Sequence, residues 1–128
     1  MKKVLVANRG EIARRVLRTL KKMDIRSVAI YSDADANAPH VLEADEAEYV
    51  GKSPSAESYL RQDKIIQICN DLGVDGIHPG YGFLSENAGF ARKLKDNGIK
   101  LIGPSPESME VMGDKLSAKQ AVKSYNVP

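Results

Sequence analysis

The sequence predicts an α/β domain with a doubly wound, Rossmann-like parallel sheet flanked by helices. Two observations carry this prediction. Short apolar runs rich in β-branched residues alternate with segments of helical periodicity, which is typical of parallel sheets built from right-handed crossovers. Polar and glycine-rich turns follow the apolar runs in NRG, SDAD, HPGYG and IGPSP. The carboxyl ends of parallel strands, where these turns would gather, form the usual ligand-binding edge.

The first half of the chain contains three predicted strands and one long helix. Residues 3–8 (KVLVAN) and 27–32 (SVAIYS) are typical of strands buried on both faces, and residues 46–51 (EAEYVG) predict a shorter strand. The segment 32–40 is predicted to be a loop, because its residues favour turns and caps. After Gly10 the apolar positions follow the helical repeat. They are Ile12, Ala13, Val16, Leu17, Leu20 and Met23.

The second half continues the alternation. The apolar residues of 63–72 share one helical face, and Gly73 is a typical helix stop. A brief strand follows at 75–78, and Ser85 is predicted to cap a helix that runs to Asn97. Three further elements are expected. They are a strand at 100–103, a helix at 105–112 with proline in its first turn, and a helix at 115–125.

Composition and charge indicate one domain spanning residues 1–128. The chain is 42% hydrophobic and 28% charged with a net charge of +2, which gives no argument for binding nucleic acid or a membrane. A single cysteine allows no internal disulfide. No segment approaches the roughly 18 apolar residues of a membrane span, and the apolar run after Lys3 is too short for a signal peptide. We therefore expect a cytoplasmic protein, and the lack of a transit-like leader favours a bacterial or archaeal one.

Several common chemistries are not favoured. NRGEIA holds one glycine where a dinucleotide fingerprint needs three, and Glu11 places negative charge where phosphate would bind, so Asp33 is better explained as a turn residue. No Walker-type phosphate loop occurs. His40 and His78 have no second ligand at metal-binding spacing, so no metal site is expected in this chain. Cys69 lies on an apolar helical face and is predicted to be a core residue.

Two sets of charges stand out. The helix after Gly10 carries a basic face, which is either solvated and neutralised by Glu43, Glu46 or Glu48, or forms a subunit contact. Its residues are Arg14, Arg15, Arg18, Lys21 and Lys22. Lys115 lies in the first turn of a predicted helix, where a cation opposes the helix dipole at a cost of about 0.3–1 kcal/mol. It is either a solvated side chain beside Asp114 or part of a phosphate site.

The segment HPGYGFLSEN, residues 78–87, is an unusually constrained connection between a strand and a helix. Pro79 fixes a turn, and Gly80 and Gly82 permit positive φ or the close approach of another group. Tyr81 is displayed between the glycines. The segment therefore predicts a rigid wall of a ligand site, and the alternative is a tight corner in which Tyr81 and Phe83 fill the core.

Three motifs, ANRGEIA at 7–13, HPGYGFLSEN at 78–87 and GPSPESMEVMGDK at 103–115, resemble the N-terminal domain of the biotin carboxylase family. The resemblance covers the whole chain and keeps the order and spacing of the motifs. It implies a pre-ATP-grasp domain of a ligase that carboxylates biotin on a carrier protein, using ATP, bicarbonate and Mg²⁺. Known members serve acetyl-, propionyl- and methylcrotonyl-CoA, pyruvate and urea carboxylases.

The resemblance also implies roles for particular residues. Lys115 would contact ATP phosphate, the long basic helix would lie near a subunit interface of a homodimer, and Arg18 would be a candidate contact there. The substrate pocket would be lined from one segment, by His78, Gly80, Tyr81, Gly82, Glu86 and Asn87. No catalytic residue is expected in this chain.

The family continues into an ATP-grasp domain and a C-terminal domain, which supply the nucleotide clamp, the magnesium carboxylates and the general base. We therefore expect these 128 residues to be catalytically inert alone and to bind no cofactor tightly. The expected partners are the ATP-grasp portion, the biotin carboxyl carrier protein and a carboxyltransferase, which selects the acyl or keto-acid substrate. The alternative is a stand-alone regulatory or subunit-assembly module with the same fold.

Overall fold

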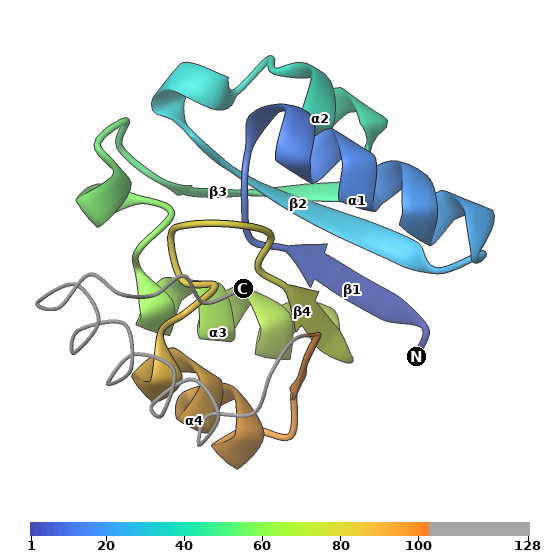
Figure 1. Cartoon of the computed structure of the whole chain (residues 1–128). Coiled ribbons are helices and arrows are strands. Elements are labelled where there is room, and N and C mark those ends of the chain that lie inside the picture. Colours follow the sequence, from blue (N-terminus) through green and yellow to red (C-terminus); the bar gives the residue numbers. More distant parts are fainter. Residues whose placement is uncertain (103–128) are drawn as a thin grey trace, which may run out of the picture.

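The computed structural model describes residues 1–102, and every strand pairing in this part is parallel (Figure 1). In chain order the elements are β1 (Lys3–Val6), α1 (Gly10–Lys22), β2 (Arg26–Ser32), a 3₁₀ turn (Asp33–Asp35), α2 (Pro39–Glu43), β3 (Glu46–Gly51), a second 3₁₀ turn (Ser55–Glu57), α3 (Gln62–Leu72), β4 (Gly76–His78), α4 (Ala88–Asp96) and β5 (Lys100–Leu101). No helix among these residues is long and apolar enough to cross a membrane.

The sheet has the strand order β3-β2-β1-β4-β5. The chain steps outward from β1 to β3 and then returns to β4 on the other side of β1. Because each crossover is right-handed, this reversal puts α1 and α2 on one side of the sheet and α3 and α4 on the other (Figure 1). The predicted doubly wound class is therefore confirmed. The reversal point, between β1 and β4, is where doubly wound sheets bind their ligands.

Strand β1 is the centre of both cores. Val4 and Val6 pack against α1, whereas Leu5 and Ala7 belong to the larger cluster formed with α3 and α4. All four side chains are 0–1% exposed. Successive residues of a strand point to opposite faces, so a continuous apolar run is what a strand covered on both sides requires.

Two local predictions are corrected. The predicted loop at 32–40 contains the 3₁₀ turn and the start of α2, whose first residue is Pro39, a residue that suits the first turn of a helix. The cap of α4 is Asn87 rather than Ser85: its Oδ1 accepts a hydrogen bond from the Phe90 amide at 2.9 Å. The predicted stop at Gly73 is confirmed by its left-handed φ of +67°. The helices expected at 105–112 and 115–125 lie outside the described residues.

Candidate functional site

Two of the predicted turns meet at the reversal point of the sheet. The Ala7 amide donates to the His78 carbonyl at 2.9 Å, which extends the pairing of β1 and β4 beyond the strands. The Asn8 side chain then crosses to the neighbouring loop, where its Nδ2 donates to the Pro79 carbonyl at 2.9 Å and to the Tyr81 carbonyl at 2.6 Å. Asn8 is only 2% exposed. The NRG and HPGYG turns are therefore one structural unit.

The HPGYG loop has a backbone that few residues adopt. Gly80, Gly82 and Phe83 have φ of +67°, +70° and +48°. The two glycines serve different needs. A Cβ on Gly80 would lie 2.8 Å from Asn8 Nδ2 and 2.9 Å from Ile12 Cγ2, whereas a Cβ on Gly82 would meet no atom of the described residues within 4 Å. Gly80 permits close packing, and Gly82 leaves open space beside Tyr81.

Tyr81 and Phe83 lie in different surroundings. Tyr81 is 78% exposed. Phe83 packs against the larger core, and its ring centroid lies 5.3 Å from that of Tyr59. The core-filling alternative therefore holds for Phe83 and is wrong for Tyr81. The loop is anchored by one aromatic residue and displays the other.

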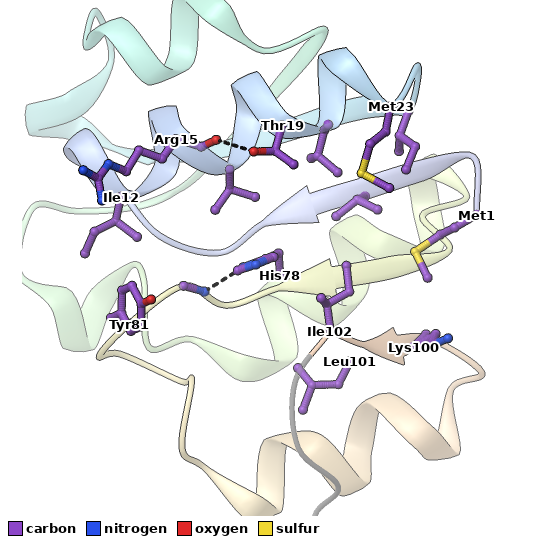
Figure 2. Close-up of a pocket in the computed structure, with 15 residues that line it drawn as sticks. Met1, Ile12, Arg15, Thr19, Met23, His78, Tyr81, Lys100, Leu101 and Ile102 are labelled. Carbon is purple, nitrogen blue, oxygen red and sulfur yellow. Dashed lines mark hydrogen bonds between the residues drawn. The ribbon is translucent and has the colours of Figure 1, made fainter.

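His78 has a defined tautomer. Its Nδ1 accepts a hydrogen bond from the Gly80 amide at 3.1 Å, so the ring proton of the neutral form is on Nε2. Burial lowers the pKa of His78, because a charged imidazolium is disfavoured away from water. The neutral ring is therefore an N–H donor near pH 7. His78 also lines a groove beside the loop (Figure 2).

The groove has a volume of about 790 Å³ and runs beside α1 over β4 and β5. Figure 2 shows Ile12, Thr19 and Met23 along its α1 side and Leu101 and Ile102 on its opposite side. Tyr81 lies at one end and Met1 at the other. The lining is mostly aliphatic, and His78 and Tyr81 add polar groups where the groove reaches the HPGYG loop.

The remaining predicted pocket residues lie at the far end of the same loop. Glu86 is exposed, and Asn87 caps α4. Leu84 is 2% exposed and ties this part of the loop to the larger core. The predicted residues at 78–87 thus share one segment, whereas Lys115 lies outside the described residues.

An ion pair beside the site, between the half-exposed Arg9 side chain and the buried Asp35 carboxylate, was not predicted. Arg9 Nε and Nη2 donate to the two carboxylate oxygens of Asp35, each at 2.6 Å, and Tyr59 donates its hydroxyl hydrogen to the same carboxylate at 2.5 Å. The hydrogen bonds from Arg9 and Tyr59 hold the pKa of Asp35 down to about 2. Burial, together with the bond to Asp35, raises the pKa of Tyr59 to about 12. The only sequence signal was that Arg9 and Asp35 each closely follow a strand.

The basic face of α1 is partly neutralised within the described residues. Arg14 Nη2 lies 2.8 Å from Glu43 Oε2, and Arg18 Nη1 lies 3.6 Å from Glu11 Oε2. Glu46, one of the carboxylates predicted to neutralise this face, instead pairs with Lys3 at 2.8 Å and Arg26 at 3.6 Å. Cys69 is buried in the larger core, as predicted, and burial raises the pKa of its thiol to about 12.

No group of three or more metal-ligating side chains occurs among residues 1–102. What this part of the chain offers is a rigid loop with an exposed aromatic side chain, a neutral imidazole N–H and open space at Gly82. Fold and site together define a Rossmann-like domain that presents a constrained loop with an exposed aromatic side chain at the reversal point of its sheet.

Comparison with known proteins shows which family of Rossmann-like domains this chain resembles. Residues 1–109 match the family model of the biotin carboxylase N-terminal domain. The biotin carboxylase of Halalkalibacterium halodurans is 58% identical over 127 residues, and the mitochondrial propionyl-CoA carboxylase alpha chain of Caenorhabditis briggsae is 51% identical over 125 residues. The biotin carboxylase domain of the Hydrogenobacter thermophilus 2-oxoglutarate carboxylase, solved with MgADP and bicarbonate, superposes with a TM-score of 0.87 at 48% identity.

The chain belongs to the biotin carboxylase N-terminal domain family. The matches cover 99%, 98% and 95% of this chain but only 28%, 17% and 27% of the three relatives, in the same order. The chain therefore spans less than a third of the length of each.

Proposed function

We propose that this chain works as the first domain of a biotin carboxylase, which carboxylates carrier-bound biotin with ATP and bicarbonate. The observation that carries the proposal is the HPGYG loop, held rigidly at the ligand-binding edge of the sheet with Tyr81 exposed. The family membership and the MgADP and bicarbonate in the Hydrogenobacter thermophilus structure support the same reading.

The described residues fit a small, neutral ligand with a flat polar ring, such as the ureido ring of biotin. Tyr81 offers an exposed aromatic face, Gly82 leaves room beside it, and His78 Nε2 can donate a hydrogen bond. Biotin supplies the ureido nitrogen that takes up the carboxyl group. In this proposal the chain binds and orients. His78, Gly80, Tyr81, Gly82, Glu86 and Asn87 form one wall of the pocket, and Lys115 contacts ATP phosphate.

The rest of the site is proposed to come from an ATP-grasp domain and a C-terminal domain of the complete enzyme. The groove beside α1 supports this, because a mostly apolar surface next to a site is typical of a docking face. A carrier protein, a carboxyltransferase and a second copy of the enzyme are the proposed partners. Magnesium would be held by the other domains, and the proposed location is the cytoplasm.

The test is a graft. The matching 127-residue region of the Halalkalibacterium halodurans biotin carboxylase is replaced by this chain, and ATP-dependent carboxylation of biotin is measured by phosphate release. The grafted enzyme is expected to be active, while the purified chain alone, given ATP, bicarbonate and free biotin, releases phosphate only at background rate. A correctly folded graft without activity would contradict the proposal, and turnover by the chain alone would contradict the shared site.

The graft also separates the enzyme from the alternative, a regulatory or subunit-assembly module. A module would bind a partner subunit without responding to nucleotide. If the chain is instead a biotin carboxylase domain, the carboxylation activity of the grafted enzyme should depend on Lys115 and on the HPGYG loop.

A further inference from the structure

We propose that Asn8 is the positioning residue of this site: it fixes the HPGYG loop so that Tyr81 is presented to biotin in one orientation. The effect of Asn8 on the kinetics with biotin rests on the proposed function. The anchoring of the loop by Asn8 rests only on the described residues.

Both polar atoms of the Asn8 side chain, Oδ1 and Nδ2, are hydrogen-bonded. Its Oδ1 accepts a hydrogen bond from the Arg9 amide at 2.9 Å, which orients the amide group so that Nδ2 faces the loop. Both Nδ2 hydrogens are then used, one on the carbonyl before Gly80 and one on the carbonyl after it. At 2% exposure there is little water to replace these bonds, and a buried carbonyl left unpaired costs about 1–3 kcal/mol.

Asn8 can approach the loop this closely because residue 80 has no side chain. The missing side chain of Gly80 is the space that Asn8 and Ile12 occupy. The positive φ of Gly80 turns the carbonyls of Pro79 and Tyr81 toward the same donor. The Asn8 side chain thus donates the hydrogen bonds to the loop carbonyls that the backbone of a neighbouring strand would otherwise donate.

A second anchor holds the loop two residues further on. Phe83 packs on the ring of Tyr59, whose hydroxyl binds Asp35, and Asp35 in turn holds Arg9, the residue after Asn8. Tyr81 therefore lies between an anchor at its own carbonyl and an anchor at Phe83. A backbone fixed on both sides with a side chain 78% exposed is preorganised for contact with a ligand, since less freedom is lost on binding.

The first test uses the full chain. In Asn8→Asp a carboxylate replaces the donor and faces two carbonyl oxygens. Amide hydrogen exchange at Gly80 and Ser85, loop amides that donate to His78 Nδ1 and to the Gly82 carbonyl, is therefore expected to accelerate at least about tenfold. Exchange in β1 and β2 should stay as in the unsubstituted chain. Asn8→Ala, which removes the donor without adding charge, is the second variant if the first does not fold.

The matched control is Ser27→Ala. Ser27 is also buried and hydrogen-bonded through its side chain, to Asp45, but it lies at the opposite end of the sheet. It is expected to lower stability without a selective change in the loop. Equal acceleration across the whole chain in the Asn8 variants, or none in the loop, would overturn the proposal.

The second test places the same variants in the grafted enzyme. Asn8→Asp or Asn8→Ala is expected to raise the KM for biotin and lower kcat/KM about 10–100-fold, the scale of a misplaced contact group, with the KM for ATP unchanged. Ser27→Ala should move neither constant. An unaltered KM for biotin despite a loosened loop would overturn the positioning role. An inactive unsubstituted graft would instead refute the proposed function, while hydrogen exchange would still decide whether Asn8 anchors the loop.

Discussion

Gly80 and Gly82 show how two residues of one motif can be glycine for different physical reasons. Both have positive φ, but only Gly80 has atoms of Asn8 and Ile12 where a side chain would be. Sequence alone predicts the conformational need at both positions, because closely spaced glycines around a displayed aromatic indicate positive φ. It does not distinguish them, since the contacts at Gly80 come from Asn8 and Ile12, which lie far earlier in the chain.

Substitution by alanine should separate the two roles. Gly82→Ala meets only backbone strain and is expected to lower the free energy of unfolding by about 1 kcal/mol. Gly80→Ala adds a steric clash in a packed site and should lower it by about 2–4 kcal/mol. Urea denaturation of the full chain measures both, and each variant serves as the control for the other. Equal losses would contradict the close packing of Asn8 on Gly80.

The Arg9–Asp35 pair predicts a particular acid sensitivity. The pKa of Asp35 is lowered from 3.8 to about 2. A carboxyl whose pKa is lower in the folded state stabilises the fold above its unfolded value and loses that contribution as the pH falls through its folded value. The pair therefore contributes on the order of 1–2 kcal/mol above about pH 5, and this contribution disappears between about pH 4 and pH 2.

Asp35→Asn isolates this contribution. The free energy of unfolding of the unsubstituted chain should exceed that of Asp35→Asn most at pH 5, and the difference should shrink toward pH 2. Glu43→Gln is the control, because Glu43 also pairs with an arginine but is exposed, and exposed pairs contribute little. A difference that does not change with pH would show that Asp35 is not held ionised by Arg9 and Tyr59.

At the scale of single elements, the N-cap of α4 could not be assigned from the sequence alone, because two suitable residues lie close together. Ser85 and Asn87 are both good N-cap residues and lie two positions apart. The choice of Asn87 depends on the loop before it: Ser85 and Asn87 donate their own amides to the carbonyls of Gly82 and Leu84, so the chain is still turning there. The helix can begin only after these turns close.

The choice of cap is directly testable. Asn87→Ala removes the acceptor for the Phe90 amide and should lower the free energy of unfolding by about 1 kcal/mol. Ser85→Ala, which removes no cap, should lower it by less than about 0.5 kcal/mol. Thermal or urea unfolding of the full chain checks the pair. The opposite order would place the start of α4 earlier than Ala88.

Helix α2 shows where periodicity fails. It has five residues, too few for an apolar repeat to be recognised, and Pro39 suits a turn as well as a first helical turn. Its buried member, His40, is polar, and its Nε2 lies 3.2 Å from the Ile30 carbonyl. By contrast β1, α1 and α3 were predicted well because long or continuous apolar patterns determine them.

For the whole molecule, the topology decides which distant turns become neighbours. Alternation of strands and helices predicted that NRG, SDAD and HPGYG would gather at one edge. The contacts of Asn8 with the HPGYG loop and of Arg9 with Asp35 confirm this. The atoms that join the turns could not be predicted, because side-chain pairing across 26 to 73 residues leaves no local pattern in the sequence. Lys115 remains a prediction.

The central claim is that this chain supplies one wall of an active site shared with other domains. The most direct measurement compares the KM for biotin and the KM for ATP in the grafted enzyme carrying either Tyr81→Ala or Lys115→Ala. Tyr81→Ala should raise the KM for biotin severalfold and leave the KM for ATP unchanged, and Lys115→Ala should do the reverse. If neither substitution changes either constant in a folded, active graft, the chain does not contribute to the site and the account is wrong.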